Sequence, residues 1–249
     1  MTRLTDGTRL ALSTLTVWPA RAGRVDRRSA AVAMSLAPLV GALLGAVAAA
    51  AGYGVWSAGG PALLAGLIAV TVLALGTRGL HLDGLADTVD ALGSYADRER
   101  ALAIMKSPEV GPFAVVALVL ILGIDATASG QLIASGHWAA VIVATATGRL
   151  GITLACRRGV PAARPDGLGA LVAGTVPPLA ADANVVALAA AGGVAVLSWV
   201  GGLAVLAAAA VASATVAHAR RRLGGVTGDV LGACCELATA VCLAVLALA

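Results

Sequence analysis

The sequence predicts an all-α, polytopic membrane protein, because three features of its composition and pattern agree. Of the 249 residues, 59% are hydrophobic and only 12% are charged, whereas soluble domains carry about 25% charged residues. The hydrophobic residues form several runs near the length of about 20 residues that a transmembrane helix needs. The 31 glycines, among many alanines, allow such helices to pack closely. We therefore expect one integral-membrane domain over residues 1–249, a bundle of about seven spans with cytoplasmic amphipathic connecting helices.

The apolar runs place these elements in order. Residues 1–28 intersperse leucines with arginines and predict an amphipathic segment at the cytoplasmic membrane surface. Residues 183–217 are too long for one span, and Trp199 beside two glycines favours a turn at 198–202; a single tilted helix would leave six spans. The expected spans are 29–52, 61–76, 111–133, 138–156, the two halves of 183–217, and 230–248.

The positive charges favour seven spans over six. With seven, all 17 Lys and Arg residues lie on one side of the membrane, or within reach of it in the case of Arg149. The positive-inside rule makes that side cytoplasmic, so the N-terminus is expected inside and the C-terminus outside. Six spans would place the run of arginines at 220–222 outside.

Three carboxylates in the connection 78–110 are the strongest chemical signal. Asp83, Asp87 and Asp90 follow one another at i, i+4 and i+7, which places them on one face of a helix. Folding does not require three like charges there, and a divalent cation would turn their repulsion into attraction. Their hard oxygen ligands suit Mg²⁺, which leaves room for substrate phosphates. His81 beside them is a candidate general base, although a lone histidine is more often structural.

Basic residues accompany these acids, as a magnesium-dependent phosphoryl transfer requires. Arg98 and Lys106 follow in the same connection, and Arg164 stands in a Pro-Asp-Gly turn of the next one. The alternative is an amphipathic surface segment in which acids and bases pair across a helix. Asp97 and Glu99 are expected at a helix start, with Asp97 capping a helix that runs to Met105.

The last cytoplasmic connection is rich in glycine and leads into the final span. Gly225 and Thr227 are candidates for an anion site at a helix N-terminus. Asp229 is a second candidate metal ligand, or else a first-turn acid stabilised by the helix dipole. Arg149 and Glu236 lie inside spans, near enough to the cytoplasmic side to contribute a phosphate contact and a metal ligand.

The cysteines and two glycines of the first span lead to two structural predictions. The four cysteines, in or beside apolar runs, are expected to be buried free thiols. Gly41 and Gly45 fit a close helix contact, either within the chain or between copies in a homo-oligomer.

Five strings together resemble the cobalamin synthase family, the adenosylcobinamide-GDP ribazoletransferases. They are R-G-L-H-L-D-G-L-A-D-T-V-D, D-R-E-R-A-L-A-I-M-K, T-G-R-L, A-R-P-D-G-L-G and G-G-V-T-G-D-V-L-G-A-x-x-E. The resemblance runs in order along nearly the whole chain. It implies a transferase of the cell membrane, with its active site facing the cytoplasm, that completes the nucleotide loop of vitamin B12.

The resemblance also implies the reaction and its participants. Adenosylcobinamide-GDP would be joined to α-ribazole or its 5′-phosphate with release of GMP, giving adenosylcobalamin or its 5′-phosphate. Mg²⁺ would be held by Asp83, Asp87 and Asp90, and one aspartate or His81 would take the hydroxyl proton. The lipid bilayer is the other expected partner, and no nucleic acid is expected.

Two other functions fit the residues less well. CDP-alcohol phosphotransferases also use clustered membrane aspartates with Mg²⁺, but their D-x-x-D-G-x-x-A-R pattern is not met. A small-molecule transporter could use Asp125, Arg149 and Glu236 as an intramembrane pathway. Against a transporter, the sequence shows no inverted repeat, and its polar residues crowd one side.

Overall fold

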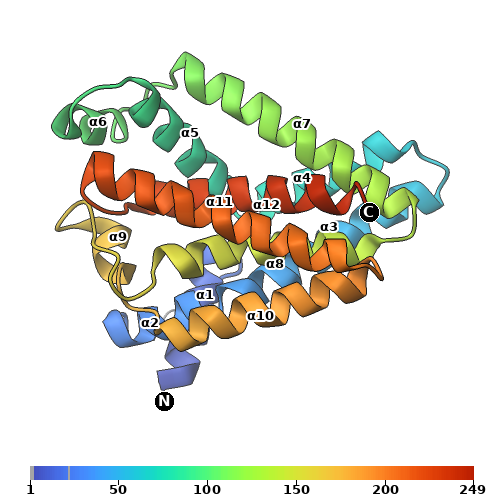
Figure 1. The fold of residues 1–249 in the computed structure, drawn as a ribbon, viewed down its shortest axis with the longest axis horizontal. Coiled ribbons are helices and arrows are strands. Elements are labelled where there is room, and N and C mark those ends of the chain that lie inside the picture. Colours follow the sequence, from blue (N-terminus) through green and yellow to red (C-terminus); the bar gives the residue numbers. More distant parts are fainter. Residues whose placement is uncertain (1–2, 22) are drawn as a thin grey trace.

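The structure is a computed structural model that describes residues 3–21 and 23–249. Within these ranges the chain forms twelve α-helices and no β-strand, which confirms the all-α prediction (Figure 1). Met1, Thr2 and Ala22, which belong to the predicted N-terminal segment, lie outside the described residues. The helices are α1 (Arg3–Leu15), α2 (Arg27–Ser35), α3 (Ala37–Ser57), α4 (Ala62–Gly76), α5 (Leu80–Gly93), α6 (Arg98–Ile104), α7 (Pro112–Ala134), α8 (Trp138–Ala155), α9 (Gly167–Val172), α10 (Pro178–Ala195), α11 (Trp199–Leu223) and α12 (Gly228–Leu246).

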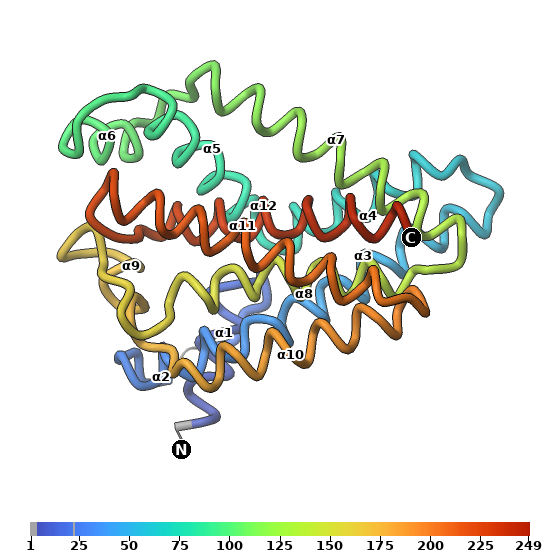
Figure 2. Tube along the Cα trace, viewed as in Figure 1, coloured from blue at the N-terminus to red at the C-terminus, as the bar shows by residue number. Residues whose placement is uncertain are grey.

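By length and composition, six helices of the described residues could cross a membrane alone: α3, α7, α8, α10, α11 and α12. The second predicted span differs, because α4 has 15 residues and reaches only about 22 Å, short of a hydrocarbon core of about 30 Å. The chain bends by 89° between α4 and α5. Helices α4 and α5 follow one another in the bundle (Figure 2), and counting this bent pair as one span would bring the number of possible spans to seven.

The predicted break in 183–217 is present, but it lies at 196–198 rather than at 198–202, because α11 already begins at Trp199. Helix α10 ends at Ala195 and α11 begins at Trp199. Between them Leu197 has a φ of 50°, and the Ser198 hydroxyl accepts a hydrogen bond from the Val200 N–H. The bounds were less well predicted, because α10 begins at Pro178 and α11 continues to Leu223. A proline can begin a helix, and the arginines at the end of α11 suit a helix C-terminus.

The first predicted span is wrong at its N-terminal end, because residues 27–35 form a separate helix, α2. Pro38 has no N–H to bond the Met34 carbonyl, so the helix stops at Leu36 and α3 begins anew. The carbonyls of α2 that this break leaves free accept hydrogen bonds from side chains of other helices. Thr153 of α8 donates its hydroxyl to the Met34 oxygen at 2.7 Å, and Asn184 of α10 donates to the Ser35 oxygen at 3.1 Å.

Close backbone contacts at glycines hold the bundle together. Gly41 and Gly45 of α3 face α8, where a Cβ on Gly45 would lie 3.0 Å from the Ile142 Cα. These two glycines therefore serve a contact within the chain. On the outside, α3 exposes Leu39, Leu43 and Val47, as expected of a surface that faces lipid.

The polar connections gather at one end of the bundle. Helices α2, α6 and α9 and the loop between α11 and α12 lie there together (Figure 1). Arg27 of α2 fixes α9 by donating to the carbonyls of Ala170 and Ala173, at 2.6 and 2.7 Å. The predicted N-terminal amphipathic helix is present as α1, which packs against α2 through Leu10, Ala11 and Leu15. This end of the bundle carries the predicted site residues of 78–110.

Candidate active site

The acidic stretch is helical, as predicted, but it lies within the bundle rather than in a loop outside it. Helix α5 packs between α7 and α12. It begins after Gly79, whose φ of 68° reverses the chain after α4. Gly84 brings it against α12, because a Cβ there would lie 2.7 Å from the Asp229 carbonyl oxygen and 3.1 Å from the Gly232 Cα. The packing therefore places the aspartates of α5 beside the first turn of α12.

Asp83, Asp87 and Asp229 lie near enough at this junction to act on one another electrostatically. The charges of Asp83, Asp229 and Asp90 all act against an ionised Asp87, and Arg164 acts in its favour. Asp229 likewise feels repulsion from Asp83 and attraction from Arg164. Asp83 is exposed, while Asp87 and Asp229 are half-buried. The three carboxylates interact electrostatically beside one guanidinium, and their hard oxygens are of the kind that a divalent cation prefers. Their ligand atoms do not all lie within 4.8 Å of one another; among the described residues, only those of His81, Cys235 and Glu236 do.

Thr227 orients Asp229 within this group. Its side-chain oxygen caps α12 by accepting from the Val230 N–H at 3.2 Å, and its hydroxyl lies 3.1 Å from the Asp229 carboxylate. Thr227 is therefore a capping and orienting residue. Sequence reasoning proposed it for phosphate binding, and the structure adds this second role.

Unlike Asp83 and Asp87, Asp90 forms hydrogen bonds to the backbone of a neighbouring helix. Its carboxylate accepts from the N–H groups of Gly111 and Ala114, at 2.6 and 2.9 Å. It thereby caps the N-terminus of α7 from a neighbouring helix, where an acid is favoured by the unpaired N–H groups and the helix dipole. The sequence analysis did not predict this role, because the two partners are 21 and 24 residues away.

Gly225 also has a structural role. The Val226 N–H donates to the Pro161 carbonyl, and the Ala163 N–H donates to the Val226 carbonyl, both at 2.9 Å. A side chain on Gly225 would collide with this backbone. The glycine is therefore needed for close packing of the two connections, which brings Arg164 to the acids.

Of the predicted basic residues, Arg164 acts on the acids, and both Arg98 and Arg164 also bond to backbone carbonyls. Arg98 donates to the Ala163 carbonyl at 3.0 Å, and Arg164 donates to the Leu102 carbonyl at 2.6 Å. These bonds join α6 to the connection that carries Arg164. Lys106 is exposed at the end of α6. Asp97 caps α6 as predicted, accepting from the Arg100 N–H at 2.9 Å.

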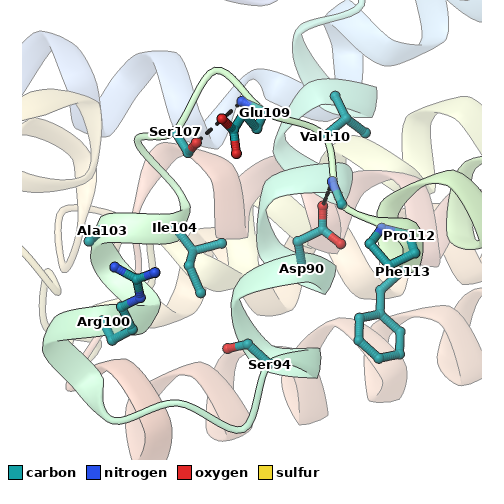
Figure 3. Close-up of a pocket in the computed structure, with 11 residues that line it drawn as sticks. Asp90, Ser94, Arg100, Ala103, Ile104, Ser107, Glu109, Val110, Pro112 and Phe113 are labelled. Carbon is teal, nitrogen blue, oxygen red and sulfur yellow. Dashed lines mark hydrogen bonds between the residues drawn. The ribbon is translucent and has the colours of Figure 1, made fainter.

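Cavities open on both sides of α5. One of about 410 Å³ lies between α5, α6 and the start of α7, where Arg100, Ser107 and Glu109 face the capped Asp90 (Figure 3). A second, of about 620 Å³, is bordered by Arg78, Asp83 and Leu118. A third, of about 170 Å³, lies on the α12 side and is bordered by Asp83, His81 and Asp229. Arg100 belongs to the basic cluster that the sequence predicts beside the acids, whereas Glu109 carries no such signal, because only the fold turns it toward a cavity.

A separate polar cluster lies deeper in the bundle. Asp125 of α7, Arg149 of α8 and Glu236 of α12 border one small cavity. Ligand atoms of His81, Cys235 and Glu236 lie within 4.8 Å of one another. Neither nitrogen of the buried His81 ring has a hydrogen-bond partner. The sequence predicts Arg149 and Glu236 at the phosphate and metal site. The structure places both beside Asp125, and it also places Glu236 near His81, which borders the cavity of Asp83 and Asp229.

The cysteines are confirmed as buried free thiols. They are Cys156, Cys234, Cys235 and Cys242.

Comparisons with known proteins identify relatives over nearly the full chain. A family model described as cobalamin-5-phosphate synthase matches residues 7–247. An adenosylcobinamide-GDP ribazoletransferase of Frankia casuarinae is 41% identical, over 96% of this chain and 94% of the relative. A protein of the same name from a Nocardioides species is 43% identical, over 96% of this chain and 96% of the relative. Another from Pseudomonas putida is 37% identical, over 92% of this chain and 93% of the relative. No solved structure matches the chain.

Proposed function

The chain belongs to the cobalamin-5-phosphate synthase family, and on that premise we propose that it is an adenosylcobinamide-GDP ribazoletransferase. It joins adenosylcobinamide-GDP to α-ribazole or its 5′-phosphate and releases GMP. The observation that carries the proposal is that Asp83, Asp229 and Arg164 all act electrostatically on Asp87, in a protein with several possible membrane spans that this family matches over residues 7–247.

The proposed reaction is a phosphoryl-type substitution. A ribose hydroxyl oxygen of the acceptor forms a bond to the phosphorus that is attached to cobinamide. The bond from that phosphorus to the bridging oxygen breaks, and its electron pair leaves with GMP. The hydroxyl proton goes to a carboxylate of the acidic group or to His81, which borders the same cavity as Asp83 and Asp229. Catalysis then rests on positioning and charge stabilisation.

Mg²⁺ fits the acidic group on the chemistry of its donors. Asp83, Asp87 and Asp229 offer hard oxygen ligands, and their mutual repulsion is only partly offset by Arg164. When bound, Mg²⁺ would neutralise diphosphate charge and hold the phosphate oxygens in place. Because Asp90 is already engaged by the N-terminus of α7, Asp229 replaces it as the third ligand in this proposal.

Cationic side chains complete the phosphate site. Arg164 is near enough to act electrostatically on both Asp87 and Asp229. Arg98 sits beside it, and Lys106 and Arg100 extend the positive charge along α6. Guanidinium groups bind phosphate oxygens in pairs, which fixes orientation as well as charge.

We place this site at the cytoplasmic face of the cell membrane. Most of the Lys and Arg residues belong to the segments around α2, α6 and α9 and to the α11–α12 loop, which gather at one end of the bundle (Figure 1), and such positively charged loops remain in the cytoplasm. Both substrates carry phosphate or ribose groups that water favours, so entry from the aqueous side suits them.

The test is turnover by the full chain in liposomes with adenosylcobinamide-GDP, α-ribazole 5′-phosphate and Mg²⁺. We expect GMP and adenosylcobalamin 5′-phosphate in equal amounts, and loss of both on chelation of the metal by EDTA. Asp83→Asn is expected to lower kcat at least a hundredfold, as removal of one transition-state contact commonly does.

Asp182→Asn is the matched control for that substitution. Asp182 is an exposed aspartate of α10 that pairs with Arg157 at 3.3 Å, and its loss should leave turnover unchanged. Folded wild-type protein that yields no GMP would contradict the proposed reaction. Turnover that persists in EDTA would contradict the metal.

A further inference from the structure

Asp83 borders two cavities of very different character. On the α7 side lies the open cavity of about 620 Å³. On the α12 side lies the enclosed cavity of about 170 Å³. Leu80, one turn earlier on α5, borders both as well. The first two turns of α5 therefore form a partition between a large space and a small one, with a carboxylate at the partition.

The small cavity is mostly apolar. Its walls come from α1, α2, α5, α8, α9 and α12. The apolar side chains that line it are Leu15, Met34, Leu80, Ile152, Leu168 and Leu231. Asp83 and Asp229 supply its acidic side. A ligand of this cavity must therefore be apolar at one end and carry a polar group at the other, such as a hydroxyl that can donate a proton to a carboxylate.

We propose that this cavity binds the aromatic base of the acceptor, so that Asp83 stands between an acceptor subsite and a donor subsite. The inference rests on the proposed function and assigns its acceptor to a particular cavity. The base of ribazole is a flat, methylated and largely apolar bicycle, whereas the donor carries a bulky corrinoid that only an open cavity can admit.

Size and chemistry agree with this occupant. An apolar cavity of about 150 Å³ in another protein is large enough to bind benzene. The 170 Å³ cavity can therefore hold most of a planar base, while the attached ribose projects toward its acidic side. That placement brings a ribose hydroxyl beside Asp83 and Asp229, where the proposed reaction needs it.

The proposal also gives the N-terminal helix a function. Leu15 of α1 closes the cavity from one side, and Leu168 of the short helix α9 closes it from another. Helix α9 is fixed to α2 by the hydrogen bonds of Arg27. Four of the six helices that line the acceptor subsite, α1, α2, α8 and α9, lie far from the acidic motif in the sequence.

The first experiment uses the wild-type protein in liposomes with acceptors that differ only in the base. Removal of the two methyl groups from the base should lower kcat/KM for the acceptor about tenfold or more, because a missing methylene in an apolar pocket costs roughly that much. The KM for adenosylcobinamide-GDP should stay the same. Equal kcat/KM for both acceptors would overturn the proposal.

A second experiment fills the cavity. Leu168→Trp should raise the acceptor KM at least about tenfold and leave the donor KM unchanged. Leu171→Trp is the control, because Leu171 lies on the same helix but does not border the cavity. A rise in the donor KM instead would assign the cavity to the donor and overturn the proposal. Absence of transfer by the wild-type protein with any acceptor would instead refute the proposed function itself.

Discussion

The Asp90 carboxylate on α5 accepts a 2.6 Å hydrogen bond from the backbone N–H of Gly111, at the start of α7. A second bond, from Ala114, completes the cap. This contact fixes the angle between the acidic helix and α7, which form walls of the two larger cavities. The third aspartate of the sequence motif thus supports the site from its edge.

Asp90→Ala should lower stability by about 1–2 kcal/mol, as loss of a helix cap does. Asp90→Asn keeps one acceptor oxygen and should lose about half as much. Thermal unfolding in detergent measures both. We also expect Asp90→Asn to retain more activity than Asp83→Asn. An Asp90→Asn variant of wild-type stability but without turnover would show that the carboxylate acts in the reaction.

Thr227→Val should raise the Mg²⁺ concentration needed for half-maximal activity about tenfold, because groups that orient a metal ligand typically contribute that much to metal affinity. The substitution removes the hydroxyl that lies 3.1 Å from the Asp229 carboxylate. A titration of turnover with Mg²⁺ measures the shift. Thr227→Ser keeps the hydroxyl and should titrate like the wild type; equal shifts in both variants would argue against an orienting role.

Gly84→Ala should separate α5 from α12 and reduce both stability and kcat. The added Cβ would lie 2.7 Å from the Asp229 carbonyl oxygen, which is backbone and cannot move aside alone. Overpacking of this kind commonly costs about 1–3 kcal/mol. Unfolding and turnover measured together test it. Gly123→Ala of α7 is the control, since a Cβ there meets nothing within 4 Å.

Thr153→Val should destabilise the protein by about 1–3 kcal/mol, because it leaves the buried Met34 carbonyl without its donor. That carbonyl is free because Pro38 interrupts the helix. Thr145→Val tests the reason, since Thr145 is equally buried in α8 but bonds only to Val141 of its own helix. Similar losses in the two variants would exclude the special role of Thr153.

Arg149→Met should destabilise the protein by about 1–3 kcal/mol, because the positive charge of Arg149 no longer offsets the two buried acids, although it forms no direct ion pair with them. Arg149 shares a small buried cavity with Asp125 and Glu236. Chemical unfolding in detergent measures the loss. If charge balance is the cause, adding Asp125→Asn and Glu236→Gln should restore part of the stability. No recovery in the triple variant would favour a direct functional role for Arg149.

The sequence predicted those parts of the bundle that depend only on neighbouring residues, such as helix bounds and caps within one helix. The lengths of α7, α8 and α12 agree with the apolar runs to within two residues at each end, since burial in lipid requires a continuous apolar stretch. The cap at Asp97 was also predictable, because its partner is three residues away. The start of α3 was not foreseen, although Pro38 is a visible signal against a continuous helix.

The site was predictable in composition but not in assembly. Spacing alone placed Asp83, Asp87 and Asp90 on one face of a helix, and that helix exists as α5. Spacing could not show that Asp90 bonds to the start of α7 or that Asp229 joins the other two. Nor could it show that Arg149 and Glu236 share a cavity with Asp125.

The sequence by itself determined that this chain is a bundle of membrane helices with an acidic helix among basic connections, because hydropathy and periodicity are properties of short segments. The tertiary structure decided which acids meet, which one caps a neighbouring helix, and how α5 divides a large cavity from a small one. Those features depend on segments far apart in the chain that pack at glycines such as Gly84 of α5 and Gly225 of the α11–α12 loop. They also depend on the angle of 89° between α4 and α5. Contacts across such separations arise only when the whole bundle closes, so no local pattern encodes them.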